Sequence, residues 1–442
     1  MARHILIFSG LLIAVLFGGW LWLAQPDVAR LPVTAVMGAR PTISEPRNEI
    51  WPTIKVADVV GWQGGAMPTP AAGLAVQPFA QGLDHPRWLL TLPNGDVLVA
   101  ESNSPPRQVG GITGLVMGWL LNKAGAGVPS ANRITLLRDG NGDGVAEQKS
   151  VLIGGLNSPM GMALLDGQLY IANTDALVRV PFTPGQTRIT AKPEVVVRYP
   201  GGGNHWARTV LPGADGKLLY VTVGSASNIA ENGIEEETGR ACILEVDPAR
   251  KTMRIYAGGL RNPQGLALEP KSKRLWTTVN ERDMQGSDLA PDYLTAVEFG
   301  DFFGWPYYYW GGYPDKRVEP KRPDLQEYSK RPDYALGPHT ASLGLAFADG
   351  ARLGPRFADG AFIGQHGSWN RVPVSGYKVI YVPFAENGFP AKGAAAVDVL
   401  TGFLDKDGNA RGRPVGVALD GAGALLVADD VGNVIWRVRA KG

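Results

Sequence analysis

The chain has one cysteine, Cys242, and few charged residues, which make up 19% of its 442 positions. A single cysteine excludes a disulfide within the chain, and its apolar neighbours in ACILEV are typical of a buried core thiol. The formal net charge of +2 gives no overall field that would favour nucleic acid, so we expect no such partner. The sequence also lacks a zinc cluster, a P-loop and a dinucleotide-binding fingerprint. Because these features are absent, the internal repeats are the main evidence for the fold.

Six stretches repeat one phrase: a short motif that often contains proline, a small-plus-aliphatic pair, a turn with Asp or Gly, and a β-rich run. They begin at Leu83, Leu156, Asn204, Leu260, Thr340 and Gly412. Their irregular spacing is compatible with one four-stranded blade plus insertions per repeat. The 58 glycines and 34 prolines suit a turn-dense all-β protein. The sequence therefore predicts a six-bladed β-propeller over residues 78–442, in which distant residues meet at one axial mouth.

The N-terminus carries twenty residues without a charge, from Ile5 to Ala24. At a rise of about 1.5 Å per residue, such a helix spans a hydrocarbon core of about 30 Å. No small-x-small cleavage site ends the run clearly, so residues 1–25 are predicted as a transmembrane anchor in preference to a cleaved signal peptide. Residues 26–77 are expected to form a tether and an edge segment. Both a transmembrane anchor and a signal peptide direct the rest of the chain across the membrane. The sequence therefore predicts a periplasmic protein anchored to the inner membrane, or a secreted protein if the N-terminus is cleaved.

A second apolar stretch, Ile112 to Gly127, interrupts the first blade and is too short and glycine-rich to span a bilayer. A helix packed on the propeller is favoured, while a lid or a membrane-facing hairpin remains open.

Four of the five histidines lie beside a repeat motif or on a loop that ends a blade. The five are His4, His85, His205, His339 and His366. His205 is the strongest candidate for proton transfer near neutral pH, because it directly precedes a strand and follows the permissive Gly201–Gly203 run. This position predicts an imidazole at the start of an innermost strand, facing the mouth.

Arginines show the same positional bias toward the starts of blades. The five are Arg87, Arg261, Arg371, Arg411 and Arg413. A guanidinium group offers a planar fork that suits carboxylates and phosphates. If the five converge, the ligand on the axis is a polyanion with several carboxylates; separate surface arginines, each paired with an acid, are the alternative.

Two segments are candidates for calcium. Asp139, Asn141 and Asp143 alternate before Gly144, as in the opening of an oxygen-rich Ca²⁺ loop. Ser150 stands where that loop would need an acid, so a plain β-turn is equally well supported. The second segment, residues 280–288, follows the fourth repeat and would face the mouth, where acids and backbone carbonyls could hold Ca²⁺.

Several motifs together resemble one family. They are LRNPQGLA, FGWP at Phe303–Pro306, the His205 segment and ARGRPVGVALDG. The chain resembles the soluble quinoprotein glucose dehydrogenase and sorbosone dehydrogenase superfamily, six-bladed propellers that use pyrroloquinoline quinone (PQQ) with Ca²⁺. The resemblance runs from about Phe79 to the C-terminus and looks closest to the sorbosone-dehydrogenase-like branch.

The resemblance implies roles for particular residues. His205 matches the family's general base, with Asn204 beside it at the cofactor. Arg261 and Asn262 match the pair that contacts the cofactor, and Arg261 would also polarise it. Arg411 and Arg413 match the pair that binds the quinone carboxylates, and the backbone carbonyls near Arg282 and Asp283 match the ligands of the cofactor calcium.

One departure concerns the family's cofactor-contacting lysine, for which no clear match exists. The corresponding stretch is GQHGSWNR, where the possible substitutes are His366, Trp369, Asn370 and Arg371.

These expectations predict a membrane-anchored quinoprotein dehydrogenase that oxidises an aldose or a sugar aldehyde by hydride transfer to PQQ. The electrons would pass to cytochrome c or a membrane quinone. Two alternatives remain open: a calcium-dependent propeller lactonase, and a non-catalytic propeller that binds a carbohydrate or a partner. The lactonase class needs a central metal held by acids and amides, and the arginine count argues against it.

Overall fold

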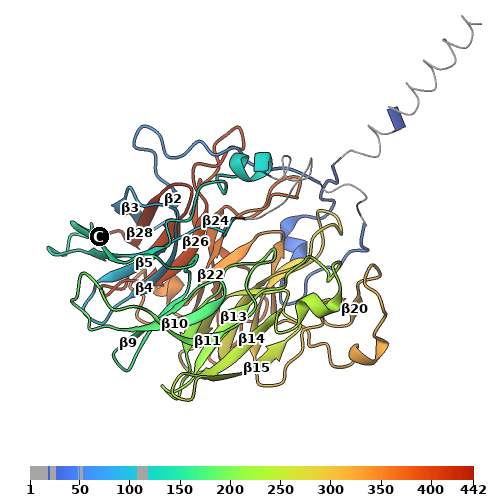
Figure 1. The fold of residues 1–442 in the computed structure, drawn as a ribbon. Coiled ribbons are helices and arrows are strands. Elements are labelled where there is room, and N and C mark those ends of the chain that lie inside the picture. Colours follow the sequence, from blue (N-terminus) through green and yellow to red (C-terminus); the bar gives the residue numbers. More distant parts are fainter. Residues whose placement is uncertain (1–17, 20–25, 48, 50–52, 107–117) are drawn as a thin grey trace, which may run out of the picture.

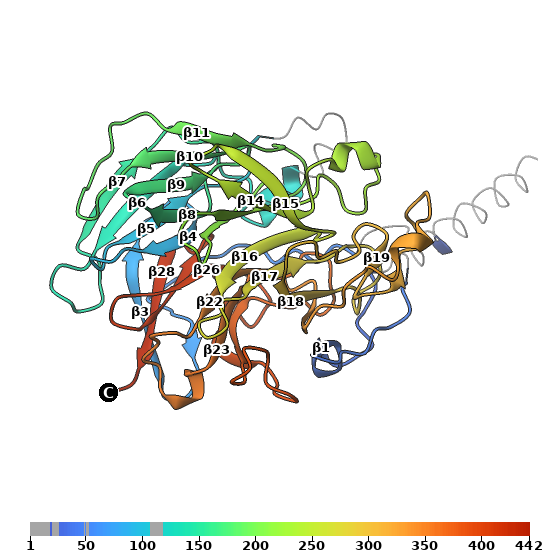
Figure 2. The same ribbon diagram turned by 90° about the horizontal axis from the view of Figure 1, so that it is seen from below.

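The computed structural model describes residues 18–19, 26–47, 49, 53–106 and 118–442. Six antiparallel sheets of four or five strands form a ring, which confirms the predicted all-β, six-bladed propeller (Figures 1 and 2). Each of the six repeats forms the first two strands of one blade. In the view from below, the innermost strands β4, β8, β16, β22 and β26 lie nearest the centre (Figure 2).

The first three blades are each built from consecutive strands. Blade 1 contains β4 (Pro86–Thr91), β5 (Val97–Glu101), β6 (Arg133–Arg138) and β7 (Gln148–Ile153). Blade 2 contains β8 (Met162–Leu165), β9 (Gln168–Ala172), β10 (Ala176–Pro181) and β11 (Glu194–Arg198). Blade 3 contains β12 (Val210–Pro212), β13 (Leu219–Val223), β14 (Cys242–Asp247) and β15 (Thr252–Gly258).

The last three blades each take one strand from the N-terminal segment. Blade 4 contains β16 (Asn262–Leu268), β17 (Leu275–Asn280), β18 (Pro291–Val297), β21 (Tyr334–Pro338) and β1 (Met37–Gly38). Blade 5 contains β22 (Ser342–Phe347), β23 (Gly360–Gln365), β24 (Lys378–Pro383), β25 (Val397–Thr401) and β2 (Thr69–Pro70). Blade 6 contains β26 (Pro414–Leu419), β27 (Leu425–Asp429), β28 (Val434–Ala440) and β3 (Leu74–Gln81).

Short elements fill the loops between these strands. They are the hairpin β19 (Tyr308–Tyr309) with β20 (Tyr313–Pro314) and the 3₁₀ turns η1 (Val33–Val36), η2 (Ile234–Glu237), η3 (Pro323–Leu325) and η4 (Pro355–Phe357).

The hydrophobic core lies between neighbouring blades. In one cluster, Leu98 and Ile134 of blade 1 pack with Ile171 of blade 2, and all three side chains are fully buried. A strand with both faces covered needs a nearly continuous apolar run, and the burial of every residue of β5, VLVAE, fits this. Since each blade packs on two neighbours, the ring holds the starts of its innermost strands at fixed positions around the axis.

The N-terminal segment closes the ring. Strand β3 pairs along its length with β28 near the C-terminus, so the first long strand completes the last blade. Strands β1 and β2 extend blades 4 and 5 at their outer edges. The segment 26–77, predicted as a tether and an edge, thus contributes three edge strands, with β3 beginning at Leu74.

Both apolar segments singled out in the sequence lie partly outside the described residues. Of the predicted anchor, Ile5–Ala24, only Gly18 and Gly19 are described, and no helix among the described residues is long and apolar enough to cross a membrane. The anchor therefore stays a prediction. Of the second segment, residues 118–123 form a short helix, and Gly125 after it lies against the side chains of Val59 and Val431. The described part agrees with a helix packed on the propeller.

Candidate active site

A cavity of about 220 Å³ opens at the end of the ring where the innermost strands begin. Arg87, at the start of β4, lines it together with His205 before β12, Arg261 before β16 and His339 before β22. Residues separated by up to 252 positions thus share one cavity because they occupy the same place in different blades. Asn262, His366, Trp369 and Asn370 line it as well.

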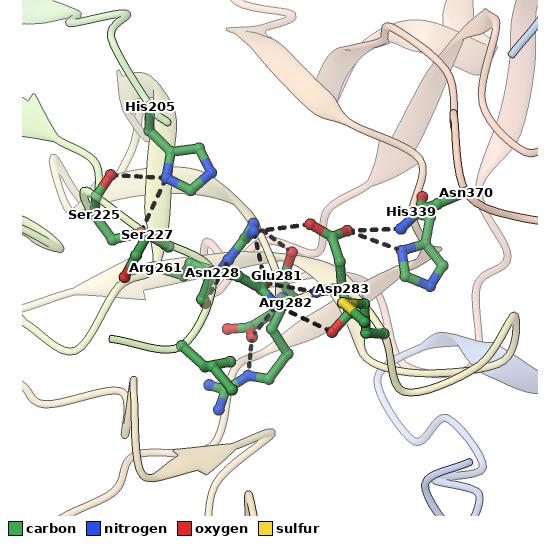
Figure 3. Close-up of polar contacts among 12 residues, drawn as sticks. His205, Ser225, Ser227, Asn228, Arg261, Glu281, Arg282, Asp283, His339 and Asn370 are labelled. Atoms are coloured by element: carbon green, nitrogen blue, oxygen red, sulfur yellow. Dashed lines mark hydrogen bonds and ion pairs between the residues drawn. The ribbon is translucent and has the colours of Figure 1, made fainter. Parts of the chain in front are cut away.

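His205 presents one ring nitrogen to the cavity and fixes the other. Its Nδ1 lies 2.9 Å from the carbonyl oxygen of Ser225 and 2.9 Å from that residue's Oγ (Figure 3). The carbonyl can only accept, so Nδ1 carries the hydrogen and Nε2 keeps its lone pair. Within the described part of the chain Nε2 has no hydrogen-bond partner. Burial and then the charge of Arg261 hold the pKa of His205 well below 6.5, which makes it a neutral base.

The backbone around His205 explains how the imidazole is placed. A Cβ on Gly224 would lie 2.6 Å from Cβ of His205 and overlap Oδ1 of Asn262, so only glycine leaves room for both. The hydroxyl of Ser225 donates to the carbonyl of Ser227 at 2.7 Å, which leaves its oxygen lone pairs directed at Nδ1. These contacts orient the ring without using Nε2.

Arg261 is held by four hydrogen bonds. Nε donates to the carbonyl of Asn228 (3.1 Å) and Nη1 to that of Glu281 (2.6 Å). Nη2 donates to Oδ1 of Asn228 and to Oδ2 of Asp283, both at 2.9 Å (Figure 3). Trp305, in the FGWP motif, donates from Nε1 to the same Asn228 carbonyl at 3.0 Å. This motif therefore helps to fix the residue that accepts from Arg261.

Asp283 joins Arg261 to a second histidine. Its Oδ1 accepts from Nδ2 of Asn370 at 2.8 Å and lies 3.6 Å from Nδ1 of His339. Burial alone would raise the pKa of Asp283. The nearby Arg261 and His339 have the larger, opposite effect and hold the pKa of this carboxyl below 3.8. Burial would likewise lower the pKa of His339, yet its bond to Asp283 raises it above 6.5. The His339 Nε2 donates to the carbonyl of Gly286 (3.1 Å), so both of its nitrogens face acceptors, as an imidazolium requires.

A second charged cluster surrounds Asp430. Its Oδ2 accepts from Nη1 of Arg87 at 2.6 Å and from Nε2 of His366 at 2.8 Å, and lies 3.3 Å from Nε2 of His85. Burial lowers the pKa of His85 and His366 to about 4. The three partners hold the pKa of Asp430 well below 3.8 against the effect of its own burial. Since Nε2 of His366 donates to Asp430, its Nδ1 carries the lone pair of the neutral ring.

Of the five arginines expected to converge, Arg87 and Arg261 line the cavity; Arg371, Arg411 and Arg413 are not among the lining residues, and their convergence stays a prediction. Arg371 donates to the carbonyls of Ser287 (2.8 Å) and Pro373 (2.7 Å). Arg413 donates to the carbonyls of His366 and Gly367, both at 3.3 Å, and so braces the turn that carries His366.

Arg411 also lies outside the cavity lining, and its backbone N–H bonds the carbonyl of Phe403 at 2.8 Å. Asn204 is likewise not a lining residue; its backbone N–H donates to Ala226 at 2.7 Å, just before His205.

The backbone carbonyls near Arg282 and Asp283 stay a prediction as ligands of the cofactor calcium. The carbonyl of Asp283 already accepts from Nδ2 of Asn228 (3.2 Å) and Nη1 of Arg317 (2.9 Å), and its side chain is the part that bonds across the cavity. Arg282 is fully buried, and its guanidinium pairs with Glu281 and Asp315.

Three of the twelve buried side-chain polar atoms without a hydrogen-bond partner in the described structure belong to residues that line this cavity. Buried and unbonded within the described residues are Nε of Arg87, Oδ1 of Asn280 and Oε1 of Glu281. Leaving such an atom unsatisfied costs about 1–3 kcal/mol, so a polar ligand would relieve the cost. Asp292 adds a third carboxyl, and burial raises its pKa to about 6.

The loop between β6 and β7, at the opposite end of blade 1, gathers three carboxyl groups. Asp139, Asp143 and Glu147 each place an oxygen within 4.8 Å of the others. Asp139 already accepts from the backbone N–H groups of Gly142 (2.7 Å) and Gly144 (2.8 Å). Asn141, predicted as a third ligand, instead pairs with Asp143 at 3.2 Å. Calcium here remains a prediction, and Glu147 was not among its predicted ligands.

A family model described as TrAA12-like matches residues 68–289 and 322–441, which together exceed half of the chain. The chain belongs to the TrAA12-like family. The match reaches all six blades and leaves out β1, β18 and the hairpin of β19 and β20. The resemblance to soluble PQQ-dependent dehydrogenases is thereby confirmed at the level of the family.

Relatives of this TrAA12-like chain are distant. A pyrroloquinoline quinone-dependent pyranose dehydrogenase of Coprinopsis cinerea is 27% identical over 300 residues, 54% of this chain and 40% of that protein. The chain thus spans less than half of that enzyme. The holo PQQ domain of the same fungus's pyranose dehydrogenase superposes with a TM-score of 0.68 at 22% identity, over 87% of this chain and all of that one. A calcium structure of a Trichoderma reesei family AA12 enzyme gives 0.69 at 19%, over 88% and 99%. These structures support the fold.

Proposed function

We propose that this chain is a PQQ-dependent dehydrogenase that oxidises an aldose or a sugar aldehyde. The observation that carries the proposal is the pairing, in one cavity, of a neutral His205 with a free Nε2 and an Arg261 held rigidly by four hydrogen bonds. A base beside a fixed cation suits removal of a proton from a hydroxyl group while negative charge builds up next to it.

The cavity fits an anionic quinone. Arg87 and Arg261 supply two guanidinium groups, and the raised pKa of His339 supplies a third positive charge. Nε of Arg87 is buried with no partner in the described structure, so a carboxylate of the quinone would complete its hydrogen bonds. We propose these residues as anion contacts in addition to the predicted pair Arg411 and Arg413.

The cavity also fits a hard cation. Oε1 of Glu281 and Oδ1 of Asn280 are buried, unbonded oxygens, and Asp283 and Asp292 bring two more carboxyl groups to the same wall. Calcium prefers such oxygen ligands. We propose that these side chains, with few or no backbone carbonyls, hold the cofactor calcium, and that its charge offsets the three carboxyl groups beside the quinone.

The chemistry divides between cofactor and chain. When bound, the quinone supplies the acceptor for a hydride, which no amino acid side chain provides. Nε2 of His205 takes the hydroxyl proton of the substrate, and Nδ1–H remains on the Ser225 carbonyl, so the resulting imidazolium keeps its orientation. Arg261 stays in place because its four acceptors do not have to move, and it favours negative charge on its cavity side.

One observation favours a second candidate, a calcium-dependent lactonase. The cavity is lined by two arginines instead of five, and by three amides and three carboxyl groups that could hold a central metal. A metal so held would polarise a lactone carbonyl without any quinone.

Absorbance separates the two candidates. Apoprotein is mixed with PQQ and Ca²⁺, and an aldose is then added. A dehydrogenase gives the spectrum of the reduced quinone, and a His205→Ala variant binds the quinone but does not reduce it. Lactone hydrolysis with Ca²⁺ alone, and an unchanged quinone spectrum, would assign the lactonase instead.

We also propose, from the sequence of residues 1–25, that the enzyme is periplasmic and anchored to the inner membrane. Cytochrome c or a membrane quinone would accept the electrons, and a sorbosone-like aldehyde is the substrate that the motifs favour.

A further inference from the structure

The rim around the cavity mouth carries large apolar side chains that face solvent. Six of them, which we call the mouth rim, are between 40% and 61% exposed: Val28, Ile54, Val60, Trp119, Val128 and Trp369. Single exposed apolar residues are ordinary, but a group on one face marks an interaction site.

Backbone contacts place these residues on one end of the propeller. Next to Ile54, the N–H of Lys55 donates to the carbonyl of Trp369 at 2.7 Å, and Val60 donates to Ala410 at 2.9 Å. Lys123, on the short helix with Trp119, pairs with Asp58 at 3.4 Å. The N-terminal segment and this helix lie over the same, upper end of the ring (Figure 1).

Val28 and Val128 belong to the same end. Ala29, beside Val28, donates from its N–H to the carbonyl of Val372 at 2.8 Å. The carbonyl of Val128 accepts from Nδ2 of Asn103 at 2.7 Å, in the loop that follows β5 at the mouth.

The length of chain before the rim indicates what covers it. Asp27 is fixed at the mouth, since its Oδ2 accepts from the N–H of Ser287 (2.6 Å) and its carbonyl from that residue's Oγ (2.9 Å). Three peptide steps separate Asp27 from Ala24, the end of the uncharged stretch. At about 3.3–3.6 Å per residue, those steps reach about 10 Å. A bilayer that takes up this stretch must therefore come within about 10 Å of the mouth.

The chemistry of the rim suits a lipid surface. Trp119 is 61% exposed, with Nζ of Lys123 5.4 Å from its ring centre, and tryptophan and lysine are the residues favoured at membrane interfaces. Arg30 and Lys55 are exposed on the same segments and could meet anionic headgroups. We propose that the mouth face of the propeller rests on a lipid bilayer, with the mouth rim among the headgroups. This inference rests on the membrane anchor proposed for residues 1–25 and does not depend on the proposed reaction.

Cysteine labelling tests the proposal in the full-length chain. Cys242 is the only cysteine and is buried, so the parent chain should take up no label and can serve as the background. Trp119→Cys and Ile54→Cys place a label on the rim. Val145→Cys places it on the β6–β7 loop at the far end, where the residue is 42% exposed. Each carries an environment-sensitive fluorophore in nanodiscs of phosphatidylcholine and phosphatidylglycerol.

Lipids brominated near the headgroup should quench both rim labels at least about twofold more than the label at position 145, and shift their emission to shorter wavelength. Equal quenching at the three positions, or a full-length chain that does not associate with the nanodiscs, would overturn the proposal. Protection of the rim labels that grows with protein concentration without lipid would assign the face to a second copy of the chain.

Discussion

Oδ2 of Asp283 lies 2.9 Å from Nη2 of Arg261, and this ion pair connects the arginine before blade 4 to the histidine before blade 5. One carboxylate therefore sets both the position of a guanidinium group and the charge of an imidazole. Cutting this link should affect two groups in the cavity at once.

Asp283→Asn should lower kcat/KM for sugar oxidation by about 10-fold or more, because a carboxylate that holds a buried cation contributes more than a neutral amide. The pKa of His339 should fall, since the bond to Asp283 is what raises it. Imidazole proton signals in an NMR titration would report this fall. Asp324→Asn is the control, because Asp324 pairs with Arg322 on the exposed surface, and its kinetics should match the parent. An unchanged His339 titration in Asp283→Asn would contradict the assignment.

The pH profile of kcat/KM should report the lowered pKa of His205. Burial and Arg261 stabilise the neutral form, so the active base persists as the pH falls through 6.5 and is lost only at a lower pH. The acid limb should therefore have its midpoint below 6.5. At higher pH the loss of charge on His339, whose pKa is raised, should weaken binding of the anionic cofactor.

Ser225→Ala should keep most of the activity, because the carbonyl of Ser225 still fixes Nδ1 of His205, whereas His205→Ala should lose about 10²-fold or more. Stopped-flow reduction of the quinone measures both variants. An acid limb centred at or above 6.5, or full activity in His205→Ala, would remove His205 as the base.

The sequence predicted the ring and the residues tied to its repeat, because both depend on local pattern. Arg261 directly precedes β16 and His205 lies five positions before β12, and register alone indicates that they face the mouth. Arg413 has the same position before β26, yet it binds the carbonyls of His366 and Gly367 from the neighbouring blade. Local pattern cannot distinguish these two outcomes.

The acids of the site were harder to predict, since their partners come from other blades. Asp430 meets Arg87 across the closure of the ring, 343 positions away. Asp283 was expected to act through its backbone carbonyl. The sequence motif indicates which loop faces the cavity, but it does not indicate whether the backbone or the side chain of a residue turns inward. The doubled acid Asp429–Asp430 at the end of β27 was a signal for this cluster.

Gly224→Ala should impair the site with little change in the fold. Its backbone does not have a positive φ, so the only cost is the overlap of the new Cβ with His205 and Asn262. Overpacking of this kind costs about 1–3 kcal/mol and here would displace the His205 imidazole. We expect kcat to fall at least about 10-fold. Gly154→Ala is a matched control, because the nearest atom to its new Cβ is 4.0 Å away. Equal kinetics in the two variants would show that the space beside His205 is not limiting.

The last prediction separates the arginine that lines the cavity from one that does not. Arg87→Gln removes a guanidinium group whose Nε is buried without a partner in the described structure. The affinity of the protein for the quinone should therefore fall about 10-fold or more. Arg411→Gln should leave that affinity unchanged, because Arg411 is not a lining residue. Titration of apoprotein with PQQ at fixed Ca²⁺, followed by quenching of tryptophan fluorescence, gives both dissociation constants. Thermal unfolding checks that Arg87→Gln still folds after Asp430 loses this partner. A larger loss in Arg411→Gln than in Arg87→Gln would favour the pairing implied by the family resemblance and place the anion site nearer to blade 6.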